Sequence, residues 1–113
     1  MPRIKRIAAT LTVVLALAAA APASAQALSK MSPNGKAKSW TVVSDKAISL
    51  KLYTNQYAHA DYYRKASNTT QRHLWNKSGI NTTATSGTGS VVFKIRTCEW
   101  IKDNDDKCSG WAF

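Results

Sequence analysis

The sequence predicts an all-β fold, a small antiparallel β-sandwich or barrel of about six to seven strands. Short runs alternate between apolar and polar residues, and Asn, Gly, Ser and Asp separate them, a pattern typical of strands joined by turns. The run AISLKLY (47–53) is the clearest, because Ile48, Leu50 and Leu52 share one face. No segment shows an apolar stripe of helical period and length. Closure into two layers is expected to bury the four tryptophans.

Strands are expected at residues 39–44, 47–53, 57–66, 72–78, 80–86, 91–101 and 108–113. The first run and the longest one, 91–101, are rich in β-branched and aromatic residues, which favour strands. The tyrosines of 57–66 suit a half-buried strand, and the sequence Asn-Lys-Ser-Gly interrupts the run at 72–78. The threonine-rich run 80–86 is typical of an edge or solvent-facing strand, and the glycines of 86–90 predict a turn.

The N-terminus predicts export. Three basic residues precede an apolar run from Ile7 to Ala21, and Ala23-Ser24-Ala25 then matches the pattern that signal peptidase accepts. We therefore expect a signal peptide at 1–25, a flexible leader at 26–39 and a single β domain at 40–113. The mature chain would have no transmembrane segment and would be secreted and extracellular.

The charge of the chain is strongly basic and unevenly distributed. Removal of the signal takes three of the sixteen Lys and Arg residues, which leaves thirteen against six acids, a net charge of +7. Residues 26–98 hold eleven basic residues and two acids, whereas 99–113 hold two basic residues and four acids. A domain with this basic charge is expected to attract anionic cell-wall or surface polymers. Another extracellular protein is the second partner that we consider. The alternative is that the charge serves only the solubility of a small secreted protein, which the absence of a compact Lys/Arg cluster favours. Nucleic acid is not an expected partner.

The two cysteines, Cys98 and Cys108, predict one disulfide across a C-terminal hairpin. If they face each other across an antiparallel pair, Ile95 opposes Trp111 and Phe93 opposes Phe113. These four residues then form an apolar, core-facing side, while Lys94, Arg96 and Trp100 share the other side with the disulfide.

No cofactor or resident metal is predicted. The turn Asp103–Asp106 holds alternating acids, but it lacks the internal glycine and the distal glutamate of a helix–loop–helix calcium loop, so a weak cation site is the most it suggests. Nine residues between the cysteines suit a cross-strand disulfide better than a redox pair, which is usually Cys-x-x-Cys.

The sequence also lacks a recognisable catalytic motif, and we expect a protein that is not an enzyme. There is no nucleophile elbow, no His/Cys metal spacing and no glycine-rich phosphate loop. His59 and His73 are the only histidines. Together with Glu99 as an alternative base they would suit acid–base cleavage of a phosphodiester, but they lie on separate expected strands and the sequence leaves their distance open.

Aromatic and basic residues interleave on several of the expected strands, where they would suit stacking on sugars or bases beside a charged groove. The alternative is ordinary cross-strand packing. The candidate binding surface comprises Tyr63, Arg64, Lys65, Trp75, Lys94, Arg96 and Trp100.

The segments ADYYRKASNTTQRHLWNKSG (60–79) and CEWIKDNDDKCSGW (98–111), with the alanine-rich signal, resemble small secreted actinobacterial, streptomycete-like proteins of unknown function that carry a C-terminal disulfide hairpin. The resemblance covers roughly 40–113 and implies export and a β fold, but no mechanism. A looser similarity, in size, export and strand composition alone, is to secreted β-sandwich bacteriocins.

These observations favour a secreted, non-enzymatic β-domain that binds a partner of undefined chemistry at or outside the cell surface. The alternative is a secreted antagonist, either a bacteriocin-like toxin or an enzyme inhibitor. A small ribonuclease that uses His59, His73 or Glu99 is the third reading.

Overall fold

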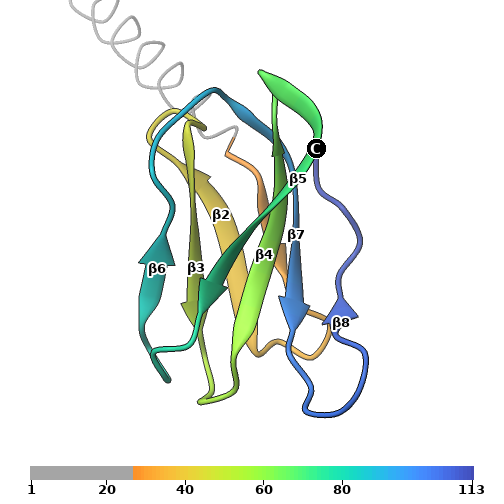
Figure 1. The fold of residues 1–113 in the computed structure, drawn as a ribbon. Helices are drawn as coiled ribbons and strands as arrows, with labels where there is room; N and C mark the ends of the chain where they lie inside the picture. Colours follow the sequence, from red (N-terminus) through yellow and green to blue (C-terminus); the bar gives the residue numbers. More distant parts are fainter. Residues whose placement is uncertain (1–26) are drawn as a thin grey trace, which may run out of the picture.

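A computed structural model describes residues 27–113, and the predicted signal peptide lies outside the described residues. Two four-stranded sheets pack face to face (Figure 1). The first sheet has the order β1 (Ser29–Met31), β2 (Ala37–Val42), β3 (Ala47–Leu52) and β6 (Thr83–Thr85). The second has the order β5 (Ser67–Asn76), β4 (Ala58–Arg64), β7 (Val92–Glu99) and β8 (Lys107–Cys108). All neighbouring strands are antiparallel, which confirms the predicted β-sandwich.

The first sheet begins earlier than the sequence predicts. Residues 29–31 and 37–39, placed in a flexible leader above, form β1 and the first half of β2, with Lys30 opposite Ser39. The Ser-Pro-Asn-Gly sequence between them is a hairpin turn: the Gly35 N–H donates to the Ser32 carbonyl at 3.0 Å, and Gly35 has a φ of 71°. Turn residues that look like a linker in the sequence therefore join two strands.

The core between the sheets is small and mainly aliphatic. Ile48, Leu50 and Leu52 are fully buried on one face of β3, as predicted, and pack with inward residues of β4 and β7. Because the inward positions of β4 include Ala58 and Ala60, the two layers leave little room for large rings other than Tyr62, which is buried in the core.

The expectation that the tryptophans are buried is therefore wrong. Trp75 is 41% exposed, and the other three are partly exposed. They lie at outward or peripheral positions, next in sequence to small or polar residues that take the inward places.

Polar side chains also connect the two layers. The Ser39 and Thr97 hydroxyls hydrogen-bond at 2.5 Å between β2 and β7. The Glu99 carboxylate, 1% exposed, accepts bonds from the Asn34 backbone N–H at 2.7 Å and from its side-chain amide at 2.9 Å. Burial alone would raise the Glu99 pKa, but the hydrogen bonds from Ser32 and Asn34 outweigh it and lower that pKa.

The C-terminal hairpin confirms the predicted disulfide, Cys98–Cys108. Cys98 pairs with Cys108 and Glu99 with Lys107, the register expected from the cysteines. Further along, Ile95 pairs with Ala112 and not with Trp111.

One extra residue on the C-terminal segment causes this shift, as in a β-bulge. The Ser109 N–H donates to the Thr97 carbonyl at 2.9 Å, but the Thr97 N–H donates to the Ser109 hydroxyl in place of a carbonyl. Ala112 consequently packs on the core. The prediction that Trp111 and Phe113 face the core is wrong: Trp111 lies against Lys94 and Arg96, and Phe113 is 80% exposed.

The disulfide should contribute a large part of the stability of so small a domain. We expect Cys98→Ala/Cys108→Ala to lower the free energy of unfolding by about 2–3 kcal/mol, because the open loop gains conformational freedom in the unfolded chain. Urea-induced unfolding followed by tryptophan fluorescence measures this loss, and reduction of the native protein should reproduce it. An unchanged midpoint in both cases would contradict the assignment.

Candidate functional site

The outward-facing side chains of β4 form the centre of the site. His59 and Asp61 alternate with the core residues Ala58 and Ala60, so they point away from the core. The strand register places His73 of β5 and Arg96 of β7 on either side of Asp61. We call His59, Asp61, His73 and Arg96, with Asp106 from the C-terminal turn, the Asp61 cluster.

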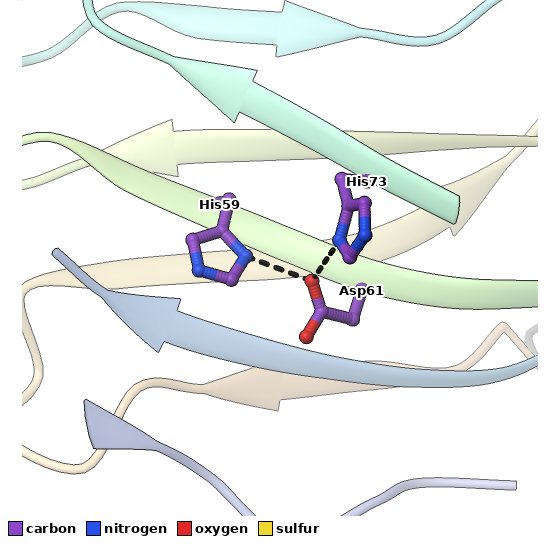
Figure 2. Close-up of side chains that lie close together, drawn as sticks. All are labelled: His59, Asp61 and His73. Carbon is purple, nitrogen blue, oxygen red and sulfur yellow. Dashed lines mark hydrogen bonds and ion pairs between the residues drawn. The ribbon is translucent and has the colours of Figure 1, made fainter. Parts of the chain in front are cut away.

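A single carboxylate holds the Asp61 cluster together. Asp61 Oδ1 accepts hydrogen bonds from His59 Nδ1 at 2.8 Å and His73 Nδ1 at 2.7 Å. Figure 2 shows the two rings approaching the same oxygen from different sides. The second oxygen, Oδ2, accepts from Arg96 Nε at 2.8 Å. Asp61 is 1% exposed, so these three donors replace the water that would otherwise solvate it.

This arrangement keeps Asp61 ionised. Burial by itself would raise the pKa of the carboxyl group, but the hydrogen bonds from His59, His73 and Arg96 outweigh burial and lower the pKa to about 2. At neutral pH the cluster is therefore built on a buried negative charge.

His59 lies between two carboxylates. Its Nδ1 faces Asp61, and its Nε2 lies 2.7 Å from Asp106 Oδ2. Burial would lower the pKa of the ring, but the bonds to both carboxylates outweigh it and raise the pKa. In its imidazolium form His59 donates one hydrogen bond to each carboxylate and so connects the C-terminal turn to β4.

His73 differs from His59 in its exposure. Its side chain is 49% exposed, with Nδ1 directed at Asp61. In this orientation Nε2 is the outer ring nitrogen, as in the aspartate–histidine pairs that orient a general base. Within residues 27–113, the ligand atoms of His59, Asp61 and His73 also lie within 4.8 Å of one another, so these three residues are able to share a metal ion.

The sequence points to both histidines but not to Asp61, and it places Asp106 only in an acidic turn. The detectable signal is His-x-Asp at 59–61, since residues two apart on a strand share a face. The contribution of Asp106 has no comparable signal, because it comes from a turn that the hairpin brings back to β4.

Three candidate binding residues do gather on the outer face of the second sheet. Lys94 Nζ lies 5.1 Å from the centre of the Tyr63 ring and 4.7 Å from that of Trp111. The Arg96 guanidinium lies 4.6 Å from the same Trp111 ring. Trp111 thus joins Tyr63, Lys94 and Arg96 in one group, which we call the Trp111 group.

A second group lies near the other end of the second sheet. Lys77 Nζ lies 4.9 Å from the Trp75 ring centre and 5.7 Å from that of Tyr57. Trp100 packs against Tyr57 at 5.5 Å, and Trp75 packs against His59 at 4.5 Å between ring centres. We call Tyr57, Trp75, Lys77 and Trp100 the Trp75 group; its Trp75 adjoins the Asp61 cluster.

The remaining two candidates lie elsewhere. Arg64 is 8% exposed, and its guanidinium donates to the carbonyls of Lys46, Gly87 and Ser90. This side chain holds loops together, because it satisfies three backbone acceptors at once, and it does not join the outer face. Lys65 lies exposed in the turn between β4 and β5.

Comparison with known proteins finds no matching family model, no similar curated protein and no similar solved structure. The resemblance to exported actinobacterial proteins therefore stays a prediction. Within residues 27–113, none of the structure is a helix of the length and apolar character needed to cross a membrane.

The Asp61 cluster predicts the pH dependence of stability. Because its pKa is lowered, Asp61 stabilises the folded protein at pH values above its ordinary pKa of 3.8. This contribution is about 2 kcal/mol and is lost as the pH falls towards 2. The raised pKa of His59 contributes stability below its ordinary value of 6.5, lost as the pH rises through the raised pKa. Urea unfolding of metal-free protein should therefore show greatest stability from these two groups between roughly pH 4 and 6.5.

Asp61→Asn is the control for the acid side of this profile. The variant should be less stable near pH 6 and should lose less further stability than the native protein between about pH 4 and 2, because one titrating carboxyl group is gone while Glu99, whose pKa is also lowered, remains. An acid-side decline as steep as that of the native protein would show that other groups cause it.

Proposed function

We propose that the protein is a secreted, non-enzymatic β-domain that binds an anionic extracellular partner through the outer face of its second sheet. The observation that carries this proposal is the placement of basic side chains over aromatic rings in the Trp111 group and the Trp75 group. Both groups lie on the sheet that also carries the Asp61 cluster.

Stacked cations and rings suit a polymer that has both sugar faces and negative charges. The rings orient Lys77, Lys94 and Arg96, which reduces the entropy that these flexible side chains lose on binding. The exposed parts of Trp75 and its neighbours provide flat apolar surface for a sugar ring. The net positive charge of the chain adds long-range attraction. Anionic cell-wall or surface polymers combine these features.

The predicted signal peptide and the disulfide support secretion. Disulfides form and persist in oxidising compartments, and the one between Cys98 and Cys108 closes the terminal hairpin. An extracellular location would also give the outer face access to surface polymers.

The geometry favours binding over the ribonuclease reading. Both ring nitrogens of His59 face carboxylates at 2.7–2.8 Å, so this ring has no nitrogen free to exchange a proton with a substrate. Glu99, the alternative base, is buried on the inner side of the second sheet and bonded to Asn34. Only His73 offers an exposed ring nitrogen.

The binding proposal predicts where charge removal matters. Lys77→Gln/Lys94→Gln should elute from a heparin-like resin at clearly lower salt than the native protein, because each change removes a cation stacked on the proposed face. The matched control is Lys38→Gln/Lys51→Gln. It removes the same charge from paired positions on β2 and β3 of the opposite sheet, where Lys51 also stacks on a tyrosine.

Equal losses in the two double variants would contradict a specific binding face and indicate attraction by net charge alone. Retention that does not depend on salt would contradict an anionic partner. Growth inhibition of a target bacterium by the purified protein would instead favour the antagonist reading.

A further inference from the structure

We propose that His59, Asp61 and His73 form a zinc site, with His59 Nδ1, His73 Nδ1 and Asp61 Oδ1 as the three protein ligands. The three atoms already converge, as Figure 2 shows. Each ring nitrogen lies 2.7–2.8 Å from the same carboxylate oxygen. This inference does not depend on the proposed binding of anionic polymers.

The spacing of the ligand atoms is close to what zinc requires. Zinc–nitrogen and zinc–oxygen distances of about 2 Å in tetrahedral geometry place ligand atoms about 3.3 Å apart. The ligand atoms lie within 4.8 Å of one another, and the two nitrogen–oxygen separations need to widen by only about half an ångström.

The neighbouring groups favour the required ring and carboxylate orientations. Metal-binding histidines usually donate the other ring N–H to a carboxylate, which fixes the tautomer. His59 Nε2 has this partner in Asp106 Oδ2 at 2.7 Å. A ligating carboxylate is usually hydrogen-bonded as well, and Arg96 Nε holds Asp61 Oδ2 at 2.8 Å, which leaves Oδ1 for the ion. The positive charge of Arg96 therefore lies on the oxygen that the ion does not use.

The position in the fold also suits a site open on one side. His59 and Asp61 are fixed on β4, between β5 and β7, and Trp75 packs against the His59 ring. The half-exposed His73 lies at the solvent side. Three protein ligands with a solvent molecule in the fourth position form the donor set of an open zinc site.

The donor chemistry selects zinc over hard cations. Two imidazole nitrogens and one carboxylate oxygen suit zinc, whereas calcium and magnesium prefer all-oxygen shells. The nearby sulfur atoms do not compete, since Cys98 and Cys108 are joined to each other and are not thiolates. Because the sequence contains only two histidines, a tag-free protein has no other imidazole that could bind zinc.

Calorimetric titration of tag-free, oxidised protein with zinc chloride, after removal of metals by a chelator, tests the proposal. We expect one zinc ion per chain and no comparable heat with calcium or magnesium. His73→Ala removes an exposed ligand and should weaken binding more than Asp106→Ala, which removes the partner of His59 and should weaken it by about 10–100-fold. Gln71→Ala, two residues from His73 on β5, is the matched control and should bind zinc like the native protein.

Circular dichroism checks that each variant is folded, and His73→Gln is a second, more conservative variant of the exposed ligand. Native protein that binds no zinc, or His73 variants that bind it as tightly as the native protein, would overturn the proposal. Loss of binding in Asp103→Asn/Asp105→Asn, with the histidine variants unaffected, would overturn it too, because it would place the ion at the acidic turn.

Discussion

The hydrogen bonds to the Asp61 carboxylate connect β4, β5 and β7 on the outer face of the second sheet. Asp61 lies on β4 and binds His73 of β5 and Arg96 of β7. Through His59 it is also linked to Asp106 in the C-terminal turn. A buried carboxylate is costly unless several donors satisfy it, so the positions of these side chains are coupled. The Cys98–Cys108 disulfide strengthens the same region covalently, with Cys98 opposite His59.

The small core explains why the outer face is rich in aromatic residues. Alanines at the inward positions of β4 bring the layers close together, and the interior is filled by residues such as Ile48, Leu50 and Ile95. Apart from Tyr62, which lies in the core, the large rings lie outside it, and Lys77 and Lys94 stack on several of them. Both proposals depend on side chains that lie on the outer face. The stacked cations proposed to bind an anionic polymer flank the Asp61 cluster, and the cluster supplies the proposed zinc ligands.

The sequence predicts most of the strands because their signal is local, but it misses β1 and the start of β5. Alternation alone assigns Ile48, Leu50 and Leu52 to the core, and the cysteine spacing gives the register at Cys98 and Cys108. The prediction fails where one residue changes the register, since a single added residue reverses which face a side chain takes. Trp111 is the clearest case.

The candidate site was predictable only in part. Lys94 and Arg96 share a face of β7 by alternation, and the register of β4 with β7, which the sequence does not give, places Tyr63 opposite Lys94. Arg64 is as basic as Lys94 and Arg96, but at an irregularity in the pairing of β4 with β7 its side chain turns towards backbone carbonyls of the loops. β4 and β5 form a hairpin that turns at Lys65 and Ala66. The expected strands 57–66 and 72–78 miss this turn, so they give no register that would place His73 beside Asp61.

The ionised Asp61 carboxylate, shared by both histidines, is the central claim, and histidine ring nitrogen spectra test it most directly. In metal-free protein at about pH 6, below the ordinary pKa of 6.5 for His59, long-range proton–nitrogen correlation should show a proton on Nδ1 of both rings, because each Nδ1 faces the Asp61 carboxylate. His59 should be protonated on both nitrogens, because each faces a carboxylate. A spectrum in which either ring carries its only proton on Nε2 would contradict the account.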